Sequence, residues 1–325
     1  MSTNTRYPEM AAFAEQVERL VSNVARAIRG KDDVVRSAVS CLMAEGHLLI
    51  EDVPGVGKTS LARALAASLK LTWNRVQFTP DLLPSDITGV SVYEQKTGQF
   101  NFRPGPVFAN LVIADEINRA SPKTQAALLE VMEERTVTTD ATVYPVARPF
   151  VVVATQNPID LEGTYRLPEA QLDRFLMRLS VGYPSTEEEM QVLRAERDQA
   201  TVTKLAPVMR ADELTAMIDY LKRSVEVAPV IENYIVGICA ATRKHADVRL
   251  GVSPRGGLAL LRAARASAGA SGRPYVTPDD VRSLAQATLA HRIILRPEAE
   301  VQGRQASDVV VRALQEVPAP RSVAR

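Results

Sequence analysis

Apolar residues along the chain follow two patterns: short runs that are largely apolar, and longer segments in which apolar residues recur at helical spacing. The runs fit buried strands and the longer segments fit amphipathic helices. Apolar strands that alternate with helices are typical of a parallel sheet covered on both faces. The pattern therefore predicts an α/β core up to about residue 184, with strands at 47–50, 72–78, 111–114, 150–154 and 175–181.

Helical periodicity dominates both ends of the chain. It predicts an opening helix within residues 1–30, ending at Gly30, and a second helix over about 32–45. Residues 185–316 are predicted to form a second, mostly helical domain, and 317–325 a flexible tail, because the tail has two prolines and no apolar periodicity. Two pairs with capping-box spacing support helices in the second domain: Thr186 with Glu189, and Thr277 with Asp280.

Two hairpins are predicted inside the core. One lies at about 85–103 and turns at Thr97-Gly98, and the other lies at 136–146 and turns near Asp140-Ala141. Between them, residues 122–134 have the spacing of a helix. The hairpins are either recognition elements or decoration, since long insertions cost little stability.

One octamer matches the phosphate-loop pattern G-x-x-x-x-G-K-[ST] at every position except the first, where aspartate replaces glycine. It lies between a predicted strand and a predicted helix, which is the order that the motif requires. Backbone amides at the start of the helix would bind phosphates, Lys58 would reach the β- and γ-phosphates, and the Thr59 hydroxyl would hold Mg²⁺. The alternative is an ordinary Gly/Pro turn with a solvent-facing lysine. The candidate ATP-binding residues are Asp52, Val53, Pro54, Gly55, Val56, Gly57, Lys58, Thr59 and Ser60.

Polar residues follow two of the predicted strands. Asp115 and Glu116 end the run at 111–114, and Asn157 follows the run at 150–154. Parallel sheets bind ligands at the carboxyl ends of their strands, so these side chains and the phosphate loop would share one site. Asp115 would hold Mg²⁺ with Thr59, Glu116 would act as general base toward water, and Asn157 would contact the same water or the γ-phosphate. Taken singly, each is also compatible with a turn.

Four segments carry a resemblance to the MoxR family of AAA+ ATPases, which covers roughly residues 20–318. They are QFTPDLLPSD from residue 77, ADEINRASPKTQAALLE from residue 114, ATQNP from residue 154 with LPEAQLDRF from residue 167, and GVSPR from residue 251. The resemblance implies an AAA+ module with a parallel five-stranded sheet, a small helical lid, and assembly into a ring that is usually a hexamer. It also implies that the two hairpins are the helix-2 insert and the pre-sensor hairpin, which face substrate or partner.

The resemblance assigns further roles residue by residue. Lys58 and Thr59 become Walker A, Asp115 and Glu116 become Walker B, and Asn157 becomes sensor 1. Arg174 becomes an arginine finger that reaches the γ-phosphate of the next subunit, and Arg255 becomes sensor 2 within its own subunit. Ile28 and Gly30, with Val34, match the adenine cradle, and core packing is the alternative for the two apolar residues. A surface salt bridge for Arg174 and a helix-start position for Arg255 are the alternatives.

Composition excludes several other classes. The 325 residues carry 39 basic and 38 acidic side chains, so no charge excess points to nucleic acid. Cys41 and Cys239 lack metal or redox spacing and are expected to be reduced core thiols, and the three histidines are scattered. We expect no signal peptide and no membrane helix, which indicates a cytoplasmic protein.

The leading hypothesis is therefore a ring-forming ATPase that remodels or matures other proteins, among them partners with von Willebrand factor A-type domains, which the resemblance implies. The alternatives are a nucleic-acid motor, a small-molecule kinase, and a nucleotide-gated scaffold with little turnover. Asp52 keeps the scaffold open, because a carboxylate aimed at phosphates would weaken ATP binding. We predict instead that its side chain turns away from them.

Overall fold

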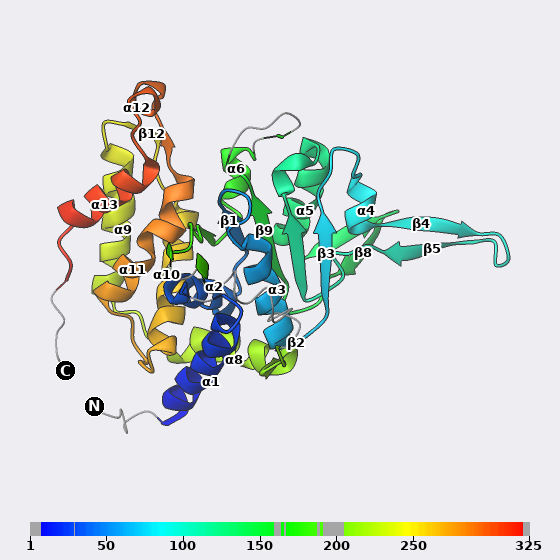
Figure 1. Cartoon of the computed structure of the whole chain (residues 1–325), viewed down its shortest axis with the longest axis horizontal. Coiled ribbons are helices and arrows are strands. Elements are labelled where there is room, and N and C mark those ends of the chain that lie inside the picture. The colour runs from blue at the N-terminus through cyan, green and yellow to red at the C-terminus, as the bar shows by residue number, and fades with distance from the viewer. Residues whose placement is uncertain are drawn as a thin grey trace.

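The computed structural model describes residues 8–28, 30–158, 164–165, 167–186, 189–190 and 205–320. An α/β core and a helical lid lie side by side, and a long two-stranded arm projects from the core on the side away from the lid (Figure 1). The predicted α/β core followed by a helical domain is confirmed.

The centre of the core is a five-stranded sheet in the order β10-β1-β9-β6-β3, with every neighbouring pair parallel. All five predicted strands are present, each starting or ending within two residues of its expected position. Their bounds are β1 (Leu48–Glu51), β3 (Trp73–Gln77), β6 (Leu111–Asp115), β9 (Val151–Gln156) and β10 (Met177–Leu179).

Alternating residues of the central strands enter two separate hydrophobic cores. In β6, Leu111 and Ile113 face one core, whereas Val112 and Ala114 face the other. The period of two follows from the pleat of a strand, and it explains why these strands need apolar residues at every position. Helices α1 (Pro8–Ala25), α2 (Asp32–Met43) and α3 (Lys58–Ser68) contribute to the first core, and α4 (Pro84–Thr88) and α5 (Pro122–Glu134) to the second.

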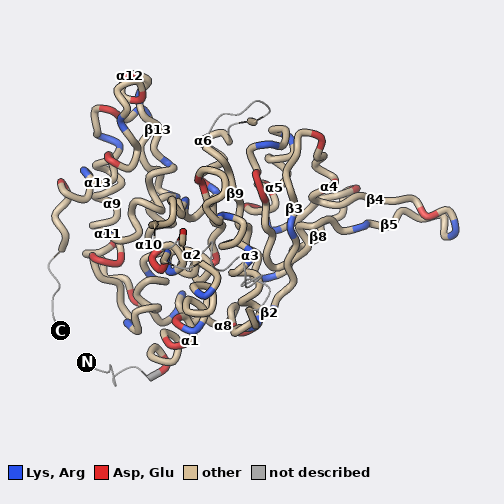
Figure 2. Tube along the Cα trace, in the orientation of Figure 1, with Lys and Arg blue, Asp and Glu red and all other residues tan. Residues whose placement is uncertain are grey.

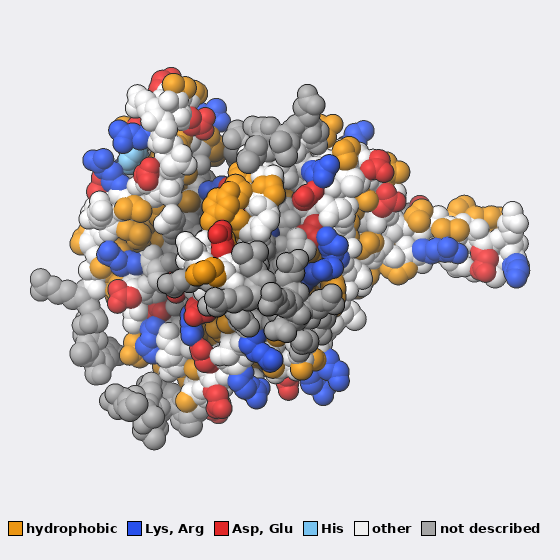
Figure 3. Space-filling model, in the orientation of Figure 1, with side chains coloured by type: hydrophobic (Ala, Val, Ile, Leu, Met, Phe, Trp, Pro, Cys, Tyr) orange, Lys and Arg blue, Asp and Glu red, His pale blue; other side chains and the backbone are white. Residues whose placement is uncertain are grey.

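Both hairpins are present. The arm consists of β4 (Gly89–Glu94) and β5 (Gln99–Pro104), and the shorter hairpin of β7 (Thr136–Thr139) and β8 (Thr142–Pro145). Residues 85–88, predicted as part of the first hairpin, instead belong to helix α4, which Pro84 opens. The ring of Phe102 in the arm stacks on Tyr144 of the shorter hairpin at a centroid distance of 4.1 Å, so the two hairpins form one unit. The arm exposes apolar side chains, with Phe100 71% exposed (Figure 3).

The lid is mostly helical, as predicted. Its main helices are α8 (Ala211–Ser224), α9 (Pro229–Lys244), α10 (Pro254–Ala270), α11 (Pro278–Leu289) and α13 (Ala306–Glu316), with the shorter η4 (Ala290–Arg292) and α12 (Pro297–Val301). Three short strands accompany them: β12 (Val248–Leu250) pairs with β13 (Ile294–Leu295), and β11 (Met209–Arg210) pairs with β2 (Leu69–Lys70) of the core.

The capping box of Thr277 and Asp280 is confirmed: the Thr277 amide donates to the Asp280 carboxylate at 2.8 Å, and Asp280 N–H donates to the Thr277 hydroxyl at 3.4 Å. Residues 187–188 are not described, so the Thr186 and Glu189 box stays a prediction. The opening helix ends at Ala25, not at Gly30, which instead has a φ of 73° in the turn before α2. Val317, the first residue of the predicted tail, packs on the lid, and residues 321–325 lie outside the described part.

Cys41 and Cys239 are both buried and reduced, as predicted. Burial raises the pKa of the Cys41 thiol to about 12, so this thiol is inert. Within the described residues no helix is long and apolar enough to cross a bilayer. Acidic and basic side chains are interspersed over core and lid, in agreement with the balanced composition (Figure 2).

Candidate active site

The phosphate-loop octamer turns sharply between β1 and α3. Gly55 and Gly57 have φ angles of 86° and 94°, in the left-handed region that residues with a Cβ rarely adopt. A Cβ at either position would meet no atom within 4 Å, so the requirement for glycine is one of backbone conformation rather than space. Helix α3 begins at Lys58, and the amides of its first turn therefore lack partners within the helix. This is the arrangement in which a helix start binds phosphate.

The side chain of Lys58 lies across the loop. Its Nζ donates hydrogen bonds to the backbone carbonyls of Asp52 and Val53, the latter at 2.8 Å. Burial lowers the pKa of the ammonium, while the carboxylates of Asp52, Glu116 and Asp115 oppose that shift. The ammonium is thus held at the loop, where phosphate oxygens could replace the two carbonyl oxygens as its hydrogen-bond acceptors.

Asp52, the residue that departs from the motif, directs its carboxylate to the segment after β10. One oxygen accepts hydrogen bonds from the Ser180 hydroxyl at 2.7 Å and the Gly182 amide at 2.6 Å, and the other accepts from Val53 N–H at 2.8 Å. Burial raises the pKa of Asp52, but these hydrogen bonds outweigh burial and hold it below its usual value. Two of these three donors lie in the segment after β10, so the carboxylate is directed toward that segment, and its orientation relative to bound phosphates stays a prediction.

Asp115 is buried at the end of β6 and accepts three side-chain donors. Thr59 and Thr155 donate to one oxygen at 3.0 and 3.2 Å, and Arg75 Nε lies 2.6 Å from the other. The hydroxyl of Thr59 and the carboxylate of Asp115 therefore converge, as predicted for the two protein groups at a magnesium site. A hydroxyl and a carboxylate are hard oxygen ligands of the kind that Mg²⁺ prefers, so the pair fits that ion.

Glu116 has a φ of 55° and a ψ of 50°, a left-handed conformation that costs a non-glycine residue about 1–2 kcal/mol. Its amide donates to the Thr155 hydroxyl at 3.0 Å. Its carboxylate accepts from Gln77 at 3.2 Å and forms an ion pair with Arg119 at 2.9 Å. The Glu116 side chain is 44% exposed whereas that of Asp115 is 2% exposed, so the adjacent acids occupy different environments and can take different roles.

Asn157 directly follows β9, next to the strand that carries Asp115 and Glu116. Its carbonyl accepts a hydrogen bond from the Asn118 side chain at 3.0 Å, which ties the end of β9 to the turn after β6. The structure thus brings Lys58, Thr59, Asp115, Glu116 and Asn157 to one edge of the sheet, as predicted.

Arg174 and Arg255 form a second group, joined through Glu133 at the end of α5. Arg174 Nε and Arg255 Nη1 each lie 2.9 Å from a Glu133 carboxylate oxygen, and the hydrogen bond from Arg255, together with the charges of both arginines, lowers the pKa of Glu133. Among the described residues, neither arginine pairs with the phosphate loop of its own chain. The structure therefore groups Arg255 with Arg174, and the predicted contact of Arg255 with phosphate in its own subunit stays a prediction.

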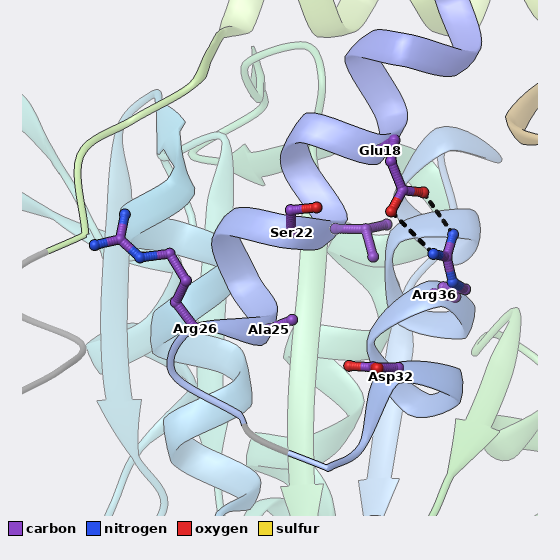
Figure 4. Close-up of a pocket in the computed structure, with 7 residues that line it drawn as sticks. Glu18, Ser22, Ala25, Arg26, Asp32 and Arg36 are labelled. Carbon is purple, nitrogen blue, oxygen red and sulfur yellow. Dashed lines mark hydrogen bonds and ion pairs between the residues drawn. The ribbon is translucent and has the colours of Figure 1, made fainter. Parts of the chain in front are cut away.

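Ile28 is buried in the core, and Gly30 lies in the turn beside Lys31, whose ammonium donates to the Tyr183 carbonyl at 2.8 Å. These are two of the residues predicted to contact adenine. A groove of about 550 Å³ lies nearby between α1 and α2, where Glu18 and Arg36 form a two-pronged ion pair (Figure 4). None of its lining residues belongs to the phosphate loop, so it is not the candidate site.

Sequence reasoning missed the supporting residues of the site. Thr155, Arg75, Gln77, Arg119 and Glu133 all contact the predicted residues. Gln77, Arg119 and Thr155 lie inside segments that resemble the MoxR family, so the resemblance already points to their positions. No local pattern indicates that Arg75 would meet Asp115, because β3 and β6 are neighbours only in the folded sheet.

Residues 47–177 match the model of the ATPase family associated with various cellular activities, and residues 240–313 match that of an AAA lid domain. The chain is similar to YeaC of Bacillus subtilis, at 50% identity over 94% of this chain and 96% of that protein. It is also similar to the chaperone MoxR1 of Mycobacterium tuberculosis, at 40% identity over 96% of this chain and 84% of that protein.

A crystal structure of a candidate ATPase from Cytophaga hutchinsonii has the same fold, with a TM-score of 0.88, 34% sequence identity, and coverage of 97% of this chain and 98% of that chain. Because this identity extends over nearly the whole chain, the similarity covers both core and lid and not only the motifs. Together with the convergence of the loop, Asp115 and Glu116, these similarities identify the chain as a member of the MoxR family of AAA+ ATPases.

Proposed function

We propose that this chain binds ATP and Mg²⁺ at the edge of its sheet, hydrolyses the nucleotide within a ring of identical subunits, and uses the cycle to remodel or assemble partner proteins. The observation that carries the proposal is the contact of Thr59 with Asp115 at 3.0 Å beside a phosphate loop of the required backbone geometry. An ordinary turn would need neither the left-handed glycines nor a buried carboxylate within reach of its threonine.

Each residue has a distinct part in the proposed reaction. The amides at the start of α3 and the ammonium of Lys58 would hold the phosphates, and Thr59 with Asp115 would hold Mg²⁺. When bound, Mg²⁺ would neutralise charge on the transferring phosphoryl group. Glu116, held by Gln77 and Arg119 rather than by the metal pair, would orient and deprotonate the attacking water, with Asn157 beside it.

Arg174 would act on the nucleotide of a neighbouring subunit. Its only described ion pair joins it to Glu133, and the side chain is 28% exposed, so a second subunit can approach it. An arginine supplied in trans raises phosphoryl-transfer rates by roughly 10³–10⁵. The site would then be complete only in a ring, for which we propose a hexamer, and we propose that Arg255 also contacts phosphate.

Protein clients are favoured over nucleic acid. Residues of both charge signs are interspersed along core and lid, and the arm offers apolar side chains such as Phe100 and Tyr93 rather than a basic stripe. The relative MoxR1 is named a chaperone, and we propose the same class of activity here, in the cytoplasm and with von Willebrand factor A-type partners. A nucleic-acid motor and a scaffold with little turnover are the competing functions.

The proposal is tested by ATPase rate against protein concentration, with sizing in each nucleotide state. Wild type should show a specific activity that rises with concentration as the ring forms, and Arg174→Ala should lose about 10³-fold or more. Glu116→Gln should bind ATP without turnover and trap clients. Arg312→Ala, which removes an exposed lid arginine paired with Glu316, is the matched control. A rate that is independent of concentration and unchanged by Arg174→Ala would rule out the intersubunit site.

A further inference from the structure

Arg292, at the end of η4 in the lid, binds the backbone on both sides of Arg174. Its Nε donates to the Asp173 carboxylate at 2.7 Å, and its Nη2 donates to the carbonyls of Asp173 at 3.0 Å and Phe175 at 2.7 Å. Its Nη1 lies 3.3 Å from the Leu176 carbonyl. A single lid side chain therefore holds the whole segment 173–176, from which Arg174 projects.

The contact is buried, which makes it specific. The Arg292 side chain is 4% exposed, and burial lowers its pKa, an effect that Asp173 opposes. A buried guanidinium needs both a counter-ion and acceptors for its planar fork, and segment 173–176 supplies both. A lysine would keep the charge but could not reach these oxygens in the same plane.

The first turn of α10 adjoins the same contact. A Cβ on Gly256 would lie 2.9 Å from Arg292 Cδ and 2.5 Å from a Val252 methyl, so only glycine leaves room for the arginine. The residue before it, Arg255, shares Glu133 with Arg174. The lid therefore contacts the surroundings of Arg174 in two ways. Arg292 binds the backbone on both sides of Arg174, and Arg255 binds Glu133, the carboxylate that pairs with the Arg174 guanidinium.

We propose that Arg292 is a positioning residue that makes the orientation of Arg174 depend on how the lid is seated in the same subunit. This inference rests on the proposed action of Arg174 in trans. When nucleotide moves the lid of one subunit, Arg292 shifts segment 173–176 with it. The position of Arg174 relative to the phosphate site of the next subunit then changes. The lid position of one subunit would then affect hydrolysis at the phosphate site of the next subunit, always in the same direction around the ring.

The test compares Arg292→Lys, Asp173→Asn and Arg174→Ala in the full-length assembled protein. Arg292→Lys should lower kcat by about tenfold or more with KM for ATP changed less than about threefold, because binding in its own site is intact. Added to Arg174→Ala, it should lower kcat by less than about twofold, because the two residues act as one unit. Arg273→Lys is the matched control, since Arg273 pairs with Asp280 inside the lid at 2.6 Å.

Mixed rings separate positioning from structural damage. Arg292→Lys subunits should regain activity when mixed with Glu116→Gln subunits, because those neighbours carry an intact Arg174 and Arg292. The same recovery is expected for Arg174→Ala. If Arg174→Ala is impaired and recovers but Arg292→Lys does not recover, or its effect adds fully to that of Arg174→Ala, the positioning role is wrong while the trans site stands.

If Arg174→Ala is not impaired, or does not recover on mixing, the proposed function itself fails. Thermal unfolding and sizing show whether each variant folds and assembles. If Arg292→Lys does not fold, Asp173→Asn takes its place, because it keeps an oxygen acceptor and removes only the charge. The expected results are the same. A variant that folds but keeps the wild-type kcat overturns the proposal.

Discussion

The carboxylate of Asp52 accepts a hydrogen bond from the backbone amide of Gly182 at 2.6 Å, which joins the start of the phosphate loop to the chain that leaves β10. Glycine, which the common motif has at this position, could not make this contact. The residue that departs from the motif therefore links the phosphate loop to the segment after β10. Gly182 has a φ of 70°, in the left-handed region that favours glycine.

Replacing Asp52 by glycine should destabilise the fold more than it changes ATP affinity. Loss of the acceptor for Ser180 and Gly182 should lower the free energy of unfolding by roughly 1–3 kcal/mol. ATP affinity, measured by titration calorimetry, should change by less than about a hundredfold, or roughly 2.7 kcal/mol. Asp52→Asn is the control, since it keeps one acceptor oxygen without the charge. A larger gain in affinity for Asp52→Gly would show that the carboxylate repels the phosphates after all.

Thr155→Val should impair hydrolysis while leaving nucleotide binding intact. The Thr155 hydroxyl accepts from Glu116 N–H and donates to Asp115, so valine removes a support from each acid. We expect kcat to fall by about tenfold or more and stability by roughly 1–3 kcal/mol, because an amide loses its partner. Thr288→Val is the matched control, since Thr288 is buried and its hydroxyl has no partner within the described structure. Equal effects of the two substitutions on kcat would contradict the prediction.

Arg75→Gln should reduce the Mg²⁺ concentration needed for half-maximal ATPase rate. Arg75 Nε lies 2.6 Å from the Asp115 carboxylate. Its positive charge offsets the negative charge of the carboxylate, which would otherwise attract Mg²⁺ more strongly. Because Arg75 is 39% exposed, the effect should be modest, about threefold or roughly 0.6 kcal/mol. Arg36→Gln, which removes an ion pair between α1 and α2, should leave the requirement unchanged. A higher requirement in Arg75→Gln would mean that Arg75 orients Asp115 for the metal.

Acidification should destabilise the fold through His47. Its Nδ1 accepts from Val152 N–H at 3.0 Å and its Nε2 lies 3.1 Å from the Met132 carbonyl, so the neutral ring is fully bonded. Burial, assisted by the charge of Arg135, lowers the pKa of His47 to about 3. Below about pH 6.5 the unfolded chain binds a proton that the folded chain does not, and the free energy of unfolding should fall by about 2 kcal/mol by pH 5.

Urea unfolding between about pH 7 and 5 measures this effect. His291 is also buried with its pKa lowered by burial, so His47→Gln should remove part of the slope rather than all of it. A slope unaffected by His47→Gln would assign the pH dependence to other groups.

Much of the site follows from the sequence because its residues are local to strand ends. Asp115 directly ends β6 and Asn157 directly follows β9, and in a parallel sheet such ends meet at one edge whatever the loops do. The left-handed glycines of the loop are likewise a local requirement. Apolar runs set the strands in the same way, since a strand buried on both faces tolerates few polar residues.

The contacts that hold those residues depend on which strands become neighbours and on where the lid docks. Arg75 meets Asp115 because β3 pairs with β6, and Asp52 meets Gly182 because β10 lies beside β1. Arg292 lies more than a hundred residues beyond Asp173, yet it binds the segment that presents Arg174. The sequence alone determined the strands, the loop and the acids, since these depend on local periodicity and strand ends. The direction of Asp52 and the grouping of Arg174, Arg255 and Arg292 were decided by tertiary structure, because buried charges find partners only when distant segments pack together.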